Sequence, residues 1–171
     1  MFEKKLKKYN IIIIDKDDLF KNLLFTKLTN KLPYNVYMFS KLDEFNTFIE
    51  NVRQIHKDVN ILIIDGTKIS ESSKLHQFNT EINQLNNKLK NYHVILLTED
   101  EKKNNFSQLK NIASTIKKNE NAAIIIENQI NFIISKDKLS ASKKIFFKLL
   151  YITIGLLIII LSIFILNYVI Y

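Results

Sequence analysis

The stretch IIIIDKDDLFKNLL (residues 11–24) decides the fold class of this chain. It opens with a continuous run of four isoleucines, which is typical of a strand buried on both faces of a parallel sheet. Apolar residues then return at helical spacing, at Leu19, Phe20, Leu23 and Leu24. The stretch therefore predicts a buried strand that leads through a charged turn into an amphipathic helix.

The same alternation of strand and helix recurs along the chain. Further strands are predicted at residues 36–39, 61–64, 94–97 and 122–126, the first of them as an edge strand. Between them, apolar residues spaced by three and four predict amphipathic helices over 42–55, 75–89 and 106–116. These alternations predict a doubly wound α/β domain around a five-stranded parallel sheet.

The C-terminal stretch, residues 149–171, carries no charge. As a helix it would extend about 34 Å, enough for a hydrocarbon core of about 30 Å. Lysines are frequent just before it, so the positive-inside bias keeps the N-terminal part in the cytoplasm. We expect a domain over residues 1–135, a basic juxtamembrane helix over 136–148 and a single-pass tail anchor over 149–171. Its location would be the cytoplasmic (inner) membrane, with the lipid bilayer as partner.

The composition excludes several classes of function. The chain has no cysteine, so it has neither disulfides nor thiolate metal sites. Its two glycines are too few for the Gly-rich loops that hold nucleotide phosphates. Arg53 is the only arginine, and the lysines are not interleaved with aromatic residues, so we expect no nucleic-acid partner. An anionic membrane surface nearby better explains the net charge of +8, and we expect neither a small-molecule substrate nor an enzymatic activity.

Chemistry is expected where the predicted strands end, because open parallel sheets bind ligands beyond the carboxyl ends of their strands. Asp15, Asp65 and Thr98 directly follow three of the apolar runs, and Glu127 with Asn128 follows the run at 122–126. Two carboxylates brought together there would repel one another unless a cation lies between them, and oxygen ligands favour Mg²⁺. Each residue also has a plainer interpretation, as a cap of the next helix.

Three segments carry a family resemblance: IIIIDKDDLFKNLL (11–24), NILIIDG (60–66) and VILLTE (94–99). They resemble the receiver domain of bacterial response regulators, which has a flavodoxin-like fold. The resemblance implies that Asp65 accepts a phosphoryl group from a histidine kinase. It also implies that Asp15 is the first of two acids that help to hold Mg²⁺ together with Asp65, and that Thr98 is the switch hydroxyl.

Two positions depart from the receiver pattern. Lys16 takes the place of the second acid, which is the more direct metal ligand in that family. The lysine that ends the fifth strand in receivers is missing if that strand is 122–126, because Glu127 and Asn128 follow it. Phosphoryl transfer depends on positioning and charge neutralisation, so both losses would slow it severely. The Lys16 ammonium could instead replace the metal and pair with Asp15 and Asp65.

Three functional hypotheses remain open from the sequence. The favoured one is a membrane-tethered, degenerate receiver that recruits a signalling complex by protein–protein contact in a two-component-type pathway. The second is a working receiver that a histidine kinase phosphorylates on Asp65. The third is a tail-anchored interaction protein that is unrelated to phosphorelay.

Overall fold

The computed structural model describes residues 9–29, 34–52, 55, 58–67, 72–99 and 111–170. Within them the chain forms five strands and four helices. In order these are β1 (Tyr9–Ile14), α1 (Asp18–Thr29), β2 (Asn35–Phe39), α2 (Leu42–Asn51), β3 (Val59–Asp65), α3 (Ser72–Lys88), β4 (Tyr92–Thr98), β5 (Ile112–Lys117) and α4 (Ala122–Ile170).

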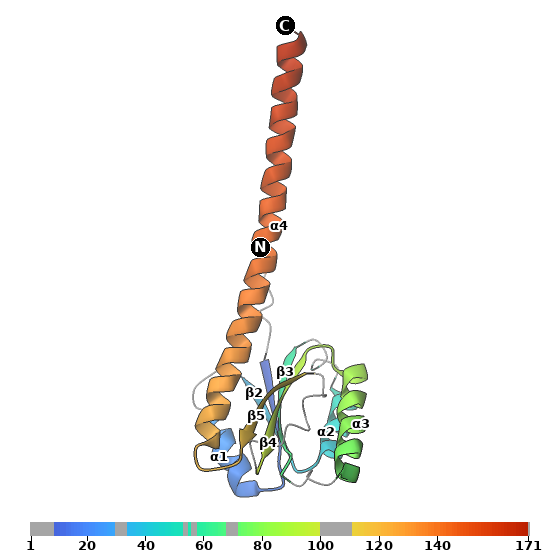
Figure 1. Cartoon of the computed structure of the whole chain (residues 1–171), viewed down its shortest axis with the longest axis vertical. Coiled ribbons are helices and arrows are strands. Elements are labelled where there is room, and N and C mark those ends of the chain that lie inside the picture. The colour runs from blue at the N-terminus through green and yellow to red at the C-terminus, as the bar shows by residue number, and fades with distance from the viewer. Residues whose placement is uncertain are drawn as a thin grey trace. The chain divides into compact units, whose positions relative to one another are not determined.

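The strands form one parallel sheet in the order β2-β1-β3-β4-β5 (Figure 1). Helices α2 and α3 lie on one face, whereas α1 and the first turns of α4 lie on the other. Every residue of β1 is buried, as is all of β3 before Asp65, because helices cover both faces of these central strands. This burial explains their unbroken isoleucine-rich runs and confirms the predicted doubly wound, five-stranded parallel sheet.

The main core cluster lies between the sheet and helices α2 and α3. Its large side chains include Ile12, Ile14, Phe45, Ile49, Leu62, Ile64, Phe78, Ile82 and Leu85. Along β1 and β3 these residues alternate with others that face the opposite side, as the period of two in a strand requires. The apolar residues predicted for the helices over 42–55 and 75–89 therefore serve as core.

Two buried asparagines and an exposed one join the amino-terminal ends of three strands. The exposed Asn35 donates its amide N–H to Asn10 Oδ1 at 2.9 Å, and Asn10 donates to Asn60 Oδ1 at 3.0 Å. Asn60 in turn donates to the carbonyl oxygen of Ile55 at 2.9 Å. The buried amides of Asn10 and Asn60 thus find partners away from water, and the pairing holds β2, β1 and β3 in one register.

The predicted strand at 122–126 is wrong, because these residues open α4. Ala122, Ala123, Ile126 and Ile130 are buried, whereas Ile124 is exposed, which is a helical pattern. The backbone N–H of residue 122 donates to the carbonyl oxygen of Asn119 at 3.0 Å, where the turn into the helix begins. A short apolar run of this length does not distinguish a buried strand from the first turns of a buried helix.

The fifth strand is instead β5, with the sequence IASTIK. Ile112 and Ile116 had been assigned to the predicted helix over 106–116, whose earlier part lies outside the described residues. As the edge strand, β5 pairs only with β4 and alternates in burial, so its sequence includes Ser114, Thr115 and Lys117. This mixed composition concealed the strand from a search for continuous apolar runs.

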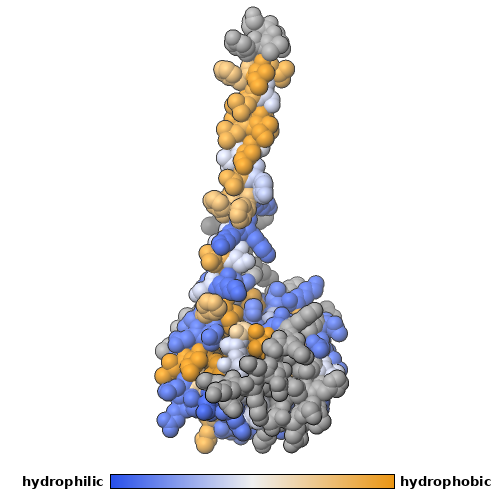
Figure 2. Space-filling model, in the orientation of Figure 1, coloured by the Kyte–Doolittle hydropathy of each residue, from blue (hydrophilic) through white to orange (hydrophobic). Residues whose placement is uncertain are grey.

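The chain divides into two compact units, Met1–Ile130 and Asn131–Tyr171. The second unit consists of the remainder of α4, whose apolar part is orange in Figure 2. Within the described residues, a window of α4 has a mean hydropathy of 3.0 and none of it is buried. By length and composition this helix can cross a membrane. The predicted boundaries at residues 135 and 148 stay predictions.

Candidate functional site

Four polar side chains lie at the carboxyl ends of four strands. Asp15 follows β1, Asp65 ends β3, Thr98 ends β4 and Lys118 follows β5. The parallel sheet brings all four strand ends to one edge, as the sequence pattern predicted for the first three residues. Lys118 was not predicted as a site residue.

The Lys118 ammonium lies among three carboxylates. Its Nζ is 2.7 Å from Asp15 Oδ2 and 3.0 Å from Asp15 Oδ1. It is also 3.7 Å from an Oδ2 atom of each of two further residues, Asp17 and Asp65. The ring of Phe20 lies beneath the ammonium, 4.9 Å from its centroid, and adds a cation–π contact. One cation therefore connects the ends of β1, β3 and β5.

Burial and pairing act in opposite directions on this ion pair. Burial raises the pKa of the Asp15 carboxyl above its ordinary value, against the lowering effect of the hydrogen bond from Lys118. Burial alone would lower the pKa of Lys118, but the hydrogen bond to Asp15 and the charges of Asp65, Asp15 and Asp17 outweigh it and raise that pKa. Lys118 therefore stays charged at neutral pH.

Asp17 begins helix α1 and fixes the loop after β1. Its Oδ1 accepts the backbone N–H groups of Leu19 at 3.1 Å and Phe20 at 3.2 Å, which is N-cap geometry. The hydrogen bond from the Phe20 N–H, together with the Lys118 charge, lowers the pKa of Asp17. The backbone N–H of Asp17 in turn donates to Asp15 Oδ1 at 2.8 Å, which orients the buried carboxylate.

Asp65 is held at the end of β3 by a tight turn. Its Oδ1 accepts the backbone N–H of Thr67 at 3.0 Å, while its side chain stays partly exposed. The next residue, Gly66, donates its N–H to the carbonyl oxygen of Leu97 at 2.8 Å. A Cβ atom on Gly66 would lie 2.9 Å from that oxygen and 2.8 Å from Leu96 Cδ1, so the close approach of β3 to β4 requires glycine.

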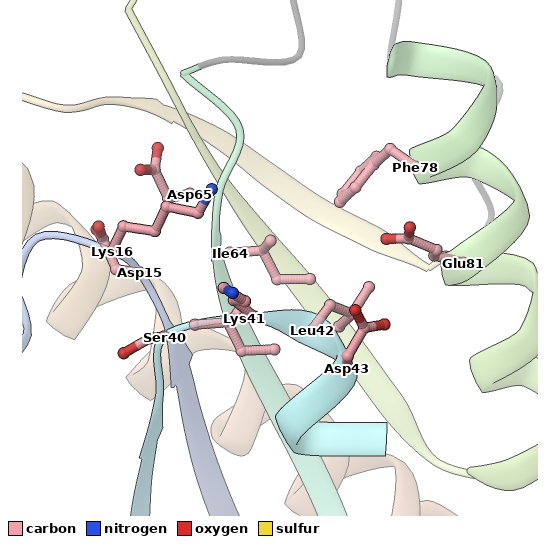
Figure 3. A pocket seen from close by; sticks show the side chains of 11 residues that line it. Asp15, Lys16, Ser40, Lys41, Leu42, Asp43, Ile64, Asp65, Phe78 and Glu81 are labelled. Carbon is pink, nitrogen blue, oxygen red and sulfur yellow. The ribbon is translucent and has the colours of Figure 1, made fainter. Parts of the chain in front are cut away.

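A cavity of about 470 Å³ opens beside Asp65 (Figure 3). It lies at the ends of β1 and β3, the point where the strand order reverses and where open α/β sheets bind ligands. Its lining residues are Ile14, Asp15, Lys16, Ser40, Lys41, Leu42, Asp43, Ile64, Asp65, Phe78 and Glu81. Lys16 is exposed and lines this cavity. The hypothesis that the Lys16 ammonium pairs with Asp15 is wrong, because the cation paired with Asp15 is Lys118.

The prediction that the fifth-strand lysine is missing is wrong. Lys118 directly follows β5, in the place that the receiver pattern reserves for that lysine. Glu127 and Asn128 lie in α4, and Glu127 Oε2 is 3.8 Å from the Nζ atom of Lys27. The sequence signal for this lysine was the pair Lys117 and Lys118 directly after Ile116. It was not recognised because the fifth strand had been assigned to residues 122–126.

The site lacks one of the ligands that a magnesium ion would need, because Lys16 stands where the resemblance requires an acid. Asp15 and Asp65 would be the remaining carboxylate ligands, and Lys118 donates to both oxygens of Asp15. Among the described residues, no three His, Asp or Glu side chains are grouped to hold a metal. The Lys118 ammonium, 3.7 Å from Asp65 Oδ2, supplies positive charge near that carboxylate.

No protein-family model and no curated protein matches this sequence. Several solved structures share its fold. A pilus assembly-related protein from Burkholderia pseudomallei is 14% identical with a TM-score of 0.52, over 71% of this chain and 88% of that one. A CheY-like response regulator receiver domain protein from Methanospirillum hungatei is 15% identical with a TM-score of 0.50, over 72% and 93%. The fold is that of a receiver domain.

The response regulator RcsB from Salmonella typhimurium is also similar. It is 18% identical with a TM-score of 0.53, over 77% of this chain but 62% of its own length. This chain thus spans less than two thirds of RcsB. At identities this low, the three structures establish the fold alone.

Proposed function

We propose that this chain is a membrane-tethered, degenerate receiver-like domain that acts by protein–protein contact in two-component-type signalling. Its mode of action would be recruitment of a signalling complex and not catalysis. The receiver fold, Lys16 in place of the second acid and the apolar part of α4 support this proposal together.

The observation that carries the proposal is Lys16, which is exposed, lines the cavity beside Asp65 and stands where the receiver pattern has its second acid. The site then lacks the carboxylate that is the more direct metal ligand in that family. The Lys16 ammonium also adds a positive charge at the end of β1. This charge disfavours a divalent cation, on which phosphoryl transfer depends for charge neutralisation. The domain would therefore hold one state and present one surface to its partner.

The tether is the apolar part of α4, with the lysines before it on the cytoplasmic side. The apolar side chains of this helix are exposed, and no other described part of the chain covers them. A bilayer would cover them with lipid. The positive-inside bias then places the receiver-like domain in the cytoplasm, beside a single-pass span of the cytoplasmic membrane. Its partner would be a signalling protein at that membrane.

A second candidate is a working receiver with Asp65 as its phosphoacceptor. The finding that favours it is Lys118 itself, whose expected absence had weakened this alternative. In this scheme Asp65 Oδ2 attacks the phosphorus of a phosphohistidine, the P–N bond breaks, and the imidazole leaves with a proton. The product is an acyl phosphate, and the Lys118 ammonium, 3.7 Å away, pairs with its added charge.

One experiment separates the two candidates. The full chain in detergent is incubated with acetyl phosphate and magnesium, and its intact mass is followed over time, with Asp65→Asn as the matched control. The degenerate receiver predicts an unchanged mass in both proteins. A phosphoryl adduct on the wild-type chain that is missing from Asp65→Asn would establish the second candidate instead.

A further inference from the structure

The segment of α4 that precedes the uncharged stretch is unusually basic. We call Lys143, Lys144 and Lys148 the proximal lysines; all three are exposed. No acidic residue lies among them, and Phe146 and Phe147 stand between them. These two rings are exposed and contact one another, with centroids 5.8 Å apart. Lysines directly before an apolar span are typical of the cytoplasmic side of a membrane–water interface.

A second pair of lysines, Lys136 and Lys138, lies earlier in the same helix and farther from the uncharged stretch. At 1.5 Å per residue, Lys143 and Lys144 lie about 7–9 Å from the start of the uncharged stretch, whereas Lys136 and Lys138 lie about 16–20 Å from it. The Debye length at physiological ionic strength is about 8 Å, so the surface charge of a bilayer reaches the proximal lysines and is largely screened at the distant pair. Asp137 lies between the distant two and halves their net charge.

We propose that the proximal lysines bind the headgroups of anionic phospholipids in the leaflet next to the domain. This inference rests on the proposed membrane tether and names its lipid partner. Lys148, at the start of the span, extends its ammonium to the headgroups while its aliphatic stem stays against apolar chains. Lys143 and Lys144 lie one turn further out, and three ammonium groups without a neighbouring acid complement a negatively charged surface.

The test uses the full chain in vesicles of a zwitterionic phospholipid that contain a minor fraction of a fluorescent anionic phospholipid. Energy transfer from a dye on the protein reports the enrichment of the anionic lipid around α4. We expect enrichment around the wild-type chain and a loss of at least about fivefold in Lys143→Gln/Lys144→Gln/Lys148→Gln. The matched control Lys136→Gln/Lys138→Gln should keep most of it, because those lysines lie beyond the surface field.

The outcomes are distinguishable from a failure of the tether itself. If the wild-type chain resists extraction by alkaline carbonate but shows no enrichment, or if both variants lose it equally, the lipid proposal is overturned and the tether stands. If carbonate releases the chain from the vesicles, the tether fails and the lipid proposal fails with it. Enrichment that depends on the proximal lysines supports both.

Discussion

At the scale of single residues, the site depends on one buried carboxylate and the cation beside it. The Asp15 side chain is fully buried, and Lys118 is its charged partner at 2.7 Å. A buried ion pair adds little net stability, but removal of one partner is costly because the other charge is left uncompensated. The loss of Lys118 should therefore lower the stability of the domain more than its position after an edge strand would indicate.

Lys118→Met should destabilise the domain by about 3 kcal/mol, because it leaves the Asp15 charge without a cation. Asp15→Asn/Lys118→Met should recover most of this loss, since no buried charge remains. Thermal unfolding of the full chain in detergent, for both variants and for Asp15→Asn, completes a double-mutant cycle. Additive effects of the two substitutions would show that the pair is not coupled.

The same variant has a predictable pH dependence. In Lys118→Met the folded-state pKa of Asp15, already raised by burial, rises further, so the folded protein binds a proton more readily than the unfolded chain. Its stability should therefore increase as the pH falls through that raised pKa. Unfolding at a series of pH values checks the sign, and a deficit that grows on acidification would contradict it.

Asp17 has a lowered pKa and should contribute in the opposite direction. Its contribution is present above the ordinary carboxyl pKa and is lost as the pH falls through the lower, folded-state value. Asp17→Asn keeps the capping acceptor and should remove this part of the acid dependence, whereas Asp17→Ala should also lower the stability at neutral pH because the cap is lost. Equal acid dependence in the wild-type chain and Asp17→Asn would refute the assignment.

At the scale of elements, the sequence predicted the central strands and the edge strand β2 well, but it missed the other edge strand, β5. β1, β3 and β4 are buried by helices on both faces, so their unbroken apolar runs reveal them. β5 has a neighbour on one side only and includes serine, threonine and lysine, so its pattern is weak. The more apolar run at 122–126 opens α4 and includes three of its buried residues, Ala122, Ala123 and Ile126. Because this run was taken for the fifth strand, Lys118 was not recognised as the lysine of the site.

The candidate site could be predicted to the same extent as its strands. Asp15, Asp65 and Thr98 follow runs that were recognised, so their positions at one edge of the sheet followed from parallel topology. Lys118 could not be placed because it depends on β5. The asparagine chain through Asn10 was likewise hidden, since it arises only when three strands are set in register.

The junction of β3 and the following turn should tolerate no side chain at Gly66. Gly66→Ala should destabilise the domain by about 1–3 kcal/mol, because its Cβ would lie 2.9 Å from a backbone oxygen of β4. Gly155→Ala is the matched control, since nothing lies within 4 Å of a Cβ there. Thermal unfolding of both variants measures the difference, and equal effects would contradict the close approach.

At the scale of the whole molecule, a receiver-like domain precedes an apolar helix. The fold is established by its topology and by the similar structures. The proposed function adds that Lys16 replaces an acid that a metal would need and that α4 determines where the domain acts. Such a protein would present one unchanging surface to its partner at the membrane.

A magnesium titration of the full chain tests most directly whether ammonium groups, and not a metal, complete this site. The amide resonances of Asp65, Thr67 and Lys118 report binding at the strand ends. We expect no saturating shift in the wild-type chain, and a saturating one in Lys16→Asp, where the second acid is restored. A saturating response of the wild-type chain that is lost in Asp65→Asn would contradict it.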